Sequence, residues 1–306
     1  MFIELQKYSN NDTKDSWSKW DSYRRTWGIV LKQTLERYNI ALNKVLLIGP
    51  GNGNDIDIEY LESTFNEIIL IDIDGEALER FLSKVTKKHK FSKKIIDISG
   101  INHLVKNLNI HNMEDDHLIK LIDQLQPSIK LDNLKTKYDL IIHCSYSTQL
   151  VSPFFTQKFI FKRQPAPSAI QKSITDLESR IHLLIFGQIH DLLHDNGLTI
   201  RFTDTFEMKY DLKNHSINPA GKRILEIMNN DWKNIDNILK PEHFKDLINQ
   251  GYSISGSLLP AEVYKNNQFI HETTFILLWP FIDNKIEIRN YIVLASVMKK
   301  LVRNNK

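Results

Sequence analysis

A short apolar run that leads directly into a glycine-rich turn is the feature that most constrains the fold. Residues 45–48 (VLLI) are continuous and aliphatic, as in strands that are buried on both faces of a parallel sheet. The next six residues, 49–54 (GPGNGN), let the backbone turn tightly and bring its N–H groups close to a ligand. A helix can begin directly afterwards on the side chain of Asn54 or Asp55. This order predicts a ligand-binding loop at the carboxyl end of the first strand.

Further apolar runs alternate with segments of helical character along the chain. We expect parallel strands at 68–71, 94–98, 140–144 and 198–202, and helices at 55–63, 75–89, 113–125 and 168–194. Two last runs, 252–259 and 274–279, alternate more and have no long helix between them, which favours an antiparallel pair. The pattern predicts an α/β fold: a seven-stranded, mostly parallel Rossmann-like sheet with helices on both faces.

An aromatic helix is expected at 16–38, before the first strand. We interpret residues 1–43 as an N-terminal helical lid and residues 44–306 as one ligand-binding domain, with helical insertions near 100–137 and 205–240 that would select the substrate. Trp20, Tyr23, Arg24 and Trp27 are the candidate substrate contacts on this helix. The alternative is that the three aromatic residues pack as one buried face, because they follow i, i+3, i+7 spacing.

An acidic residue closes the second strand. Asp72 lies 23 residues after Gly49, where a carboxylate can accept two hydrogen bonds from a ribose diol. The dinucleotide fingerprint G-x-G-x-x-G would need a third glycine at the position of Asn54. The sequence therefore predicts an adenosine-type ligand but departs from the usual dinucleotide pattern.

The series of motifs over roughly residues 40–205 resembles that of class I S-adenosylmethionine-dependent methyltransferases. The shared features are the glycine-rich loop after the first strand, an acid ending the second, an acid after the third and a polar end to the fourth, 143–146. The resemblance implies a methyltransferase with S-adenosylmethionine as its cofactor. By it, the glycines pass beneath the methionine part, the acid at 72 binds the ribose, residues 97–98 face the adenine and residues 143–145 line the sulfonium side. The residues so assigned to the cofactor are Gly49, Gly51, Gly53, Asn54, Asp72, Ile73, Asp97, Ile98, Cys144 and Ser145.

The methyl acceptor is not defined by any motif. Tyr146 and His143 are the candidate catalytic residues because they end the fourth strand, although strand alternation lets only one set of side chains face the site. A D/N-P-P-Y/F segment for base-amino methylation is missing; the nearest match, residues 152–155 (SPFF), has one proline. The acceptor is expected to be a nitrogen or oxygen nucleophile of a small molecule or peptide, and the sequence does not separate the two.

Composition narrows the class of partner. The net charge of +3 comes from 40 basic and 37 acidic residues without a polybasic block, so nucleic acid is not favoured. A single cysteine fits a reducing compartment, and with no apolar segment long enough for a membrane span we expect a cytoplasmic protein. His190 and His194 lie one helical turn apart but lack a third ligand, so no metal site is predicted. The oligomeric state stays open.

Three other functions remain as alternatives. An alkyl or aminopropyl transferase would use a relative of the same cofactor, but such enzymes usually present an acid just after the fourth strand, where this chain has residues 143–146 (HCSY). An NAD(P)-dependent oxidoreductase would keep the first strand, the glycines and Asp72, but the chain has no Tyr-x-x-x-Lys pair for proton transfer. A catalytically silent scaffold could bind S-adenosylmethionine through the same residues. The cluster at 279–281 (WPF) is interpreted as core or interface rather than as part of a site.

Overall fold

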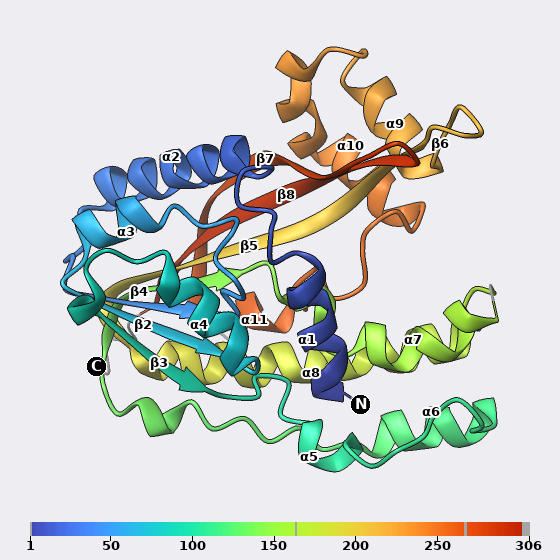
Figure 1. Ribbon diagram of the computed structural model, residues 1–306, viewed down its shortest axis with the longest axis horizontal. Coiled ribbons are helices and arrows are strands. Elements are labelled where there is room, and N and C mark those ends of the chain that lie inside the picture. The colour runs from blue at the N-terminus through green and yellow to red at the C-terminus, as the bar shows by residue number, and fades with distance from the viewer. Residues whose placement is uncertain (1, 163, 266–267, 302–306) are drawn as a thin grey trace.

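The computed structural model describes residues 2–162, 164–265 and 268–301, and its centre is one twisted sheet (Figure 1). Seven strands follow the order β3-β2-β1-β4-β5-β8-β7, and the two-residue strand β6 pairs with β5. The five strands β1 to β5 run parallel, and β8 lies antiparallel between β5 and β7. The predicted seven-stranded, mostly parallel Rossmann-like sheet is therefore confirmed. The strands are β1 (Lys44–Ile48), β2 (Glu67–Asp72), β3 (Phe91–Ile95), β4 (Tyr138–Cys144), β5 (Leu193–Asp211), β6 (Ser216–Ile217), β7 (Phe269–Asp283) and β8 (Glu287–Lys300).

The prediction of the last strand pair was partly wrong. Residues 252–259 form a loop with one isolated bridge, between Ser253 and Phe206, and the antiparallel pair is β7 with β8. Gly251 and Gly256 both have positive φ, so the backbone cannot stay extended there despite the alternating pattern. The third strand also begins three residues earlier than expected.

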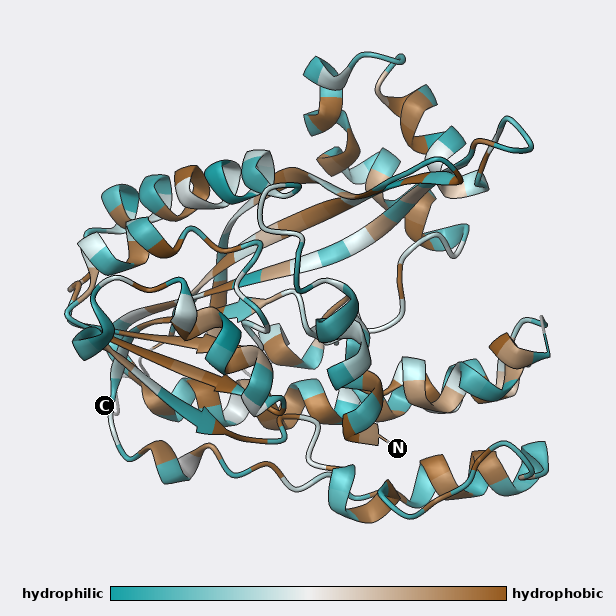
Figure 2. Ribbon diagram, viewed as in Figure 1, coloured by the Kyte–Doolittle hydropathy of each residue, from teal (hydrophilic) through white to brown (hydrophobic). Residues whose placement is uncertain are grey.

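Helices cover both faces of the sheet. Along β1, the side chains of Val45 and Leu47 face α2, α3 and α4, while those of Leu46 and Ile48 face α5 to α8. Figure 2 shows the central strands as hydrophobic and the edge strand β3 as hydrophilic, in agreement with its exposed lysines. The helices are α1 (Phe2–Asp12), α2 (Asp21–Tyr38), α3 (Ile58–Thr64), α4 (Gly75–Ser83), α5 (Asn102–Val105), α6 (Asp115–Gln124), α7 (Ser152–Phe161), α8 (Ser168–Leu192), α9 (Pro219–Ile227), α10 (Pro241–Asn249) and α11 (Glu262–Lys265).

The aromatic helix α2 is a core helix, which corrects its interpretation as a lid. Trp27 and Tyr23 are each 1% exposed. The ring of Trp27 stacks on Phe202 with centroids 5.2 Å apart, and that of Tyr23 stacks on Trp279 at 5.0 Å. The buried aromatic face left open as the alternative is thus the observed arrangement. The helix α1, which the sequence did not predict, lies across the carboxyl ends of the strands instead (Figure 1).

The two insertions lie on different parts of the molecule. The first contains α5 and α6, and α6 packs against α8. The second begins later than expected, because β5 continues to Asp211, and it carries α9 and α10. These two helices pack around Phe206, Ile224 and Leu247 at the far end of the long β5–β8 ladder (Figure 1).

No described helix is long and apolar enough to cross a membrane. No group of three or more His, Cys, Asp or Glu side chains in the described parts of the chain could hold a metal ion. His190 lies on α8 and His194 on β5, so the pair does not share one helix.

Candidate functional site

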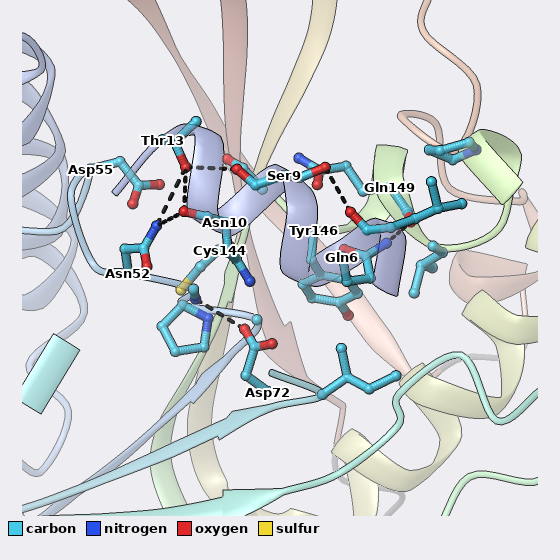
Figure 3. Close-up of a pocket in the computed structure, with 18 of the residues that line it drawn as sticks. Gln6, Ser9, Asn10, Thr13, Asn52, Asp55, Asp72, Cys144, Tyr146 and Gln149 are labelled. Atoms are coloured by element: carbon cyan, nitrogen blue, oxygen red, sulfur yellow. Dashed lines mark hydrogen bonds between the residues drawn. The ribbon is translucent and has the colours of Figure 1, made fainter. Parts of the chain in front are cut away.

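A pocket of about 350 Å³ opens where the strands end, between the glycine-rich turn, the tips of β2 and β4, and α1 (Figure 3). Its volume lies at the lower end of the range for sites that hold small ligands and cofactors. Of the ten residues assigned to the cofactor from the sequence, nine line the pocket and Gly53 does not. None of the described residues of the two insertions, 100–137 and 205–240, lines it. The turn and strand ends, rather than the insertions, therefore build the site.

The glycine-rich turn needs its glycines for conformation and for space. Gly49, Gly51 and Gly53 all have positive φ, between 51° and 67°. A Cβ atom on Gly49 would lie 2.7 Å from Cβ of Tyr146, and one on Gly53 would collide with the ring of Phe81. The turn therefore passes directly beneath Tyr146, and Gly53 serves packing against α4 rather than the pocket surface.

Asp72 joins β2 to this turn. Its Oδ2 accepts a hydrogen bond from the Gly51 N–H at 2.9 Å, and its Oδ1 accepts one from the Asp74 N–H at 2.9 Å. The carboxylate is 7% exposed, and burial raises its pKa to about 6. A carboxylate offers about four lone-pair positions, so the backbone N–H groups leave capacity for a hydroxyl group of a ligand in the pocket.

Asp97 and Ile98 follow β3 on the same side of the pocket. The Asp97 carboxylate accepts the N–H groups of Ser99 and Asn102, each at 2.9 Å, and so holds an Asx-type turn. The same side chain lines the pocket. Its structural and ligand-facing interpretations are therefore compatible.

The end of β4 carries a strained residue and a hydrogen-bonded pair. Ser145 has φ of +49°, which is uncommon for a residue with a side chain, and its buried hydroxyl lies beside that of Tyr23. The next residue, Tyr146, lines the pocket, and its hydroxyl shares a 2.7 Å hydrogen bond with Nδ1 of His143. The strained serine turns the chain so that Tyr146 lies above the glycine turn.

His143 itself points away from the pocket, which corrects its assignment as a catalytic residue. It is 1% exposed and stacks on Phe186 of α8 at 5.1 Å. Burial, followed by the nearby charge of Arg201, lowers its pKa to about 3, so the ring is neutral at physiological pH. It can orient Tyr146 but does not line the pocket.

Hydrogen bonds from asparagine side chains hold helix α1 against the glycine-rich turn. Asn52 Nδ2 donates to the Asn10 carbonyl, and Asn54 Nδ2 donates to the Thr13 carbonyl, both at 2.6 Å. Asn10 Nδ2 in turn donates to Asp74 Oδ2 at 3.0 Å. Figure 3 shows α1 crossing in front of the strand ends with Gln6, Ser9 and Asn10 at the pocket. The sequence does not predict that α1 covers the pocket, because an asparagine in the turn does not indicate which distant segment its side chain binds.

Only one of the four substrate contacts predicted on or next to α2 lies at the pocket. Trp20 lines the pocket, whereas Tyr23, Arg24 and Trp27 are not among its lining residues. Arg24 donates to the carbonyls of Trp17 and Asn54, the latter at 2.9 Å, and pairs with Asp21 at 3.0 Å. Its guanidinium therefore supports the turn and is not available for an anionic substrate.

The pocket is strongly acidic. Asp12, Asp55, Asp72 and Asp97 line it, while no lysine, arginine or histidine does so among the described residues. Asp55 receives no hydrogen bond from another side chain in the described parts of the chain, and burial raises its pKa to about 6. A pocket of this kind favours a ligand with positive charge.

Comparison with known proteins gives matches of structure but not of sequence. No protein-family model matches the chain, and no curated protein matches it. An S-adenosylmethionine-dependent methyltransferase from Clostridium acetobutylicum is 13% identical, with 97% of this chain and 99% of that chain covered and a TM-score of 0.44. The N-methyltransferase NodS from Bradyrhizobium japonicum is 11% identical over 92% and 98%, with a TM-score of 0.39. An rRNA methylase from Streptococcus thermophilus is 10% identical over 90% and 97%, with a TM-score of 0.33.

Proposed function

We propose that the pocket binds S-adenosylmethionine and that the protein transfers a methyl group to a nitrogen or oxygen nucleophile of a small molecule or peptide. The observation that carries this is the acidic pocket at the carboxyl edge of the sheet, in which Asp72 ties the tip of β2 to the glycine turn. When bound, the cofactor supplies a methyl group activated by a positively charged sulfur.

The residues present fit the parts of this cofactor. Free lone pairs on Asp72 suit the ribose hydroxyls, and the Asp97–Ile98 side of the pocket suits the adenine. The glycine turn and Ser145 suit the methionyl part, because the turn allows close backbone approach and the Ser145 hydroxyl lines the pocket. The carboxylates, together with the absence of a basic side chain from the described lining residues, favour the net positive charge of the ligand.

The same features disfavour NAD(P). A dinucleotide places its pyrophosphate at the amino end of the helix that follows the turn. Here the helix α3 is capped by Asp57, whose Oδ1 accepts the Tyr60 N–H at 3.0 Å, and Asp55 lines the pocket just before it. The phosphates would therefore meet carboxylates and no basic side chain among the described lining residues.

The chain's own contribution to methyl transfer is positioning and exclusion of water. Tyr146 is fixed above the glycine turn by its hydrogen bond to His143, and α1 covers the pocket through its bonds to the turn. Holding an acceptor in line with an activated methyl group supplies a large part of the rate enhancement for such a reaction. Because burial raises the pKa of Tyr146, its phenol keeps its proton at neutral pH and acts as a hydrogen-bond donor rather than a base.

Calorimetric titration with S-adenosylmethionine, S-adenosylhomocysteine and NADH in parallel tests the proposal. We expect binding of the first two and no saturable heat with NADH. Binding of NADH alone would favour the oxidoreductase alternative, and no binding of the first two would contradict the proposal. The protein is then incubated with methyl-labelled S-adenosylmethionine and the low-molecular-weight compounds of a cell extract. Transfer of the label to one of these compounds would show an enzyme rather than a silent scaffold.

A further inference from the structure

We propose that the methyl acceptor is an amine, recognised as a cation in a corner of the pocket formed by Asp55, Trp20, Trp279 and Phe281. This inference rests on the proposed function, since it names the class of substrate that the same pocket would take. We call these four residues the cation corner.

The cation corner lies on the side of the pocket that the adenosine part of the cofactor does not need. Asp72 ends β2 and Asp97 follows β3, and these two strands lie on one lateral side of the sheet. Trp279 belongs to β7, the outermost strand on the other lateral side. β7 runs antiparallel to β8, and β8 runs antiparallel to β5. The carboxyl end of β7 therefore lies at the same end of the sheet as the carboxyl ends of the parallel strands. Trp279 and Phe281 therefore reach the pocket from the far side of β4.

The aromatic wall of this corner is rigid. The rings of Trp20 and Phe281 stack with centroids 5.3 Å apart, and the ring of Trp279 meets that of Trp20 edge-on at 4.9 Å. Trp20 Nε1 donates to the Phe281 carbonyl at 3.3 Å, and Tyr23 backs the ring of Trp279. Trp20 and Trp279 are only 4% and 5% exposed, so the wall is already formed before a ligand arrives.

The carboxylate of the corner has no side-chain donor or paired cation among the described residues. Asp55 receives no hydrogen bond from another side chain among the described residues. Its nearest cations, Arg24 and Lys84, lie beyond ion-pair distance and donate instead to the carbonyls of Asn54 and Asn52. Ser145 lines the pocket, and its buried hydroxyl lies beside the Tyr23 hydroxyl at the back of the corner.

Asp55 lines the same pocket as the three aromatic residues of the wall. Burial, and next the charge of Asp55, raise the pKa of the Tyr23 hydroxyl, and Tyr23 stacks on Trp279. An alkylammonium would place its N–H groups toward Asp55 and Ser145 and its hydrocarbon part against the rings. A carboxylate or phosphate near the nucleophile would meet Asp55, and a neutral alcohol would leave that carboxylate without a cation.

The test uses a pair of probes with the same shape and different charge. 3,3-Dimethylbutylamine, which is protonated at neutral pH, and its uncharged analogue 3,3-dimethyl-1-butanol are titrated into the full-length protein saturated with S-adenosylhomocysteine, and tryptophan fluorescence is followed. We expect the amine to bind at least about tenfold more tightly than the alcohol. In Asp55→Asn, this preference should fall at least about fivefold while the affinity for S-adenosylhomocysteine stays within about twofold of wild type. Asp12→Asn, which removes the same charge from the exposed rim of the pocket, should keep the preference.

Three other results would contradict either the amine assignment or the proposed function. Equal affinities for the two probes in the wild-type complex would overturn the amine assignment, whatever the folding of the variants. A loss of more than about tenfold in S-adenosylhomocysteine affinity in Asp55→Asn would assign this carboxylate to the ammonium group of the cofactor and would also overturn the proposal. Failure of the wild-type protein to bind S-adenosylhomocysteine would instead contradict the proposed function, before any probe is added.

Discussion

The ionisation of Asp72 should control the affinity of the pocket for S-adenosylhomocysteine. Its buried carboxylate has a pKa raised to about 6 and keeps lone pairs free for ligand hydroxyls after accepting the Gly51 and Asp74 N–H groups. A protonated carboxyl group accepts fewer hydrogen bonds and loses the charge that strengthens them. Binding therefore requires the ionised form and should weaken as the pH falls through 6.

The size of this effect follows from the pKa. With a value near 6, Asp72 is about nine-tenths ionised at pH 7 and about one-tenth ionised at pH 5, so the affinity should fall about tenfold, or about 1.4 kcal/mol, over this range. The sign is fixed because the ligand binds the deprotonated form and its own groups do not titrate between pH 5 and 7. Binding near pH 6 should therefore release protons from Asp72.

Calorimetry from pH 5 to 8, in buffers with different ionisation enthalpies, measures both the affinity and the proton count. In Asp72→Asn the residual binding should not depend on pH in this way, while Asp12→Asn should behave as wild type. Asp55 also has a pKa near 6, so Asp55→Asn must keep the slope if Asp72 is its source. A constant affinity across this range, with circular dichroism showing a folded protein, would refute the reasoning.

Four substitutions, one of them a control, test the surrounding structure, each by urea denaturation. Gly49→Ala should lower the free energy of unfolding by about 1–3 kcal/mol, because Gly49 has a positive φ and a methyl group there would clash with Tyr146. The control Gly187→Ala, in α8, has open space around the new methyl group and should raise the free energy of unfolding by about 0.5–1 kcal/mol. Equal effects of the two substitutions would contradict the role given to Gly49. Tyr146→Phe should cost about 1–3 kcal/mol by leaving His143 Nδ1 without its partner, and an unchanged stability would show that this bond is not formed in solution. Trp27→Ala should cost about 3–5 kcal/mol because α2 is a core helix, and a cost below about 1 kcal/mol would restore the lid interpretation.

The parts of the fold that the sequence predicts are those encoded in contiguous residues. The strand 45–48 with its glycine turn, and Asp72 at the next parallel strand end, are local patterns whose structural meaning does not depend on distant partners. The same holds for the long amphipathic helix α8, whose buried residues recur at helical spacing. These elements fix the sheet and the position of the pocket.

The parts that the sequence does not predict depend on contacts between distant segments. The cover by α1 rests on Asn52 and Asn54, which bond to residues about 40 positions away, and an asparagine does not specify its partner. Trp279 looks like core from its neighbours in sequence and reaches the pocket only because β7 is added at the end of the sheet. His143 and Tyr146 could not be separated until the strand's twist and the left-handed Ser145 showed which of them faces the ligand.

A crystal structure of the protein grown with S-adenosylhomocysteine would test the central claim most directly. The account predicts ligand density beneath α1, with the ribose hydroxyls within hydrogen-bond distance of Asp72 and the sulfur near Ser145, leaving the Trp20 and Trp279 side free. Density in another cavity, or a ligand whose ribose does not contact Asp72, would contradict it.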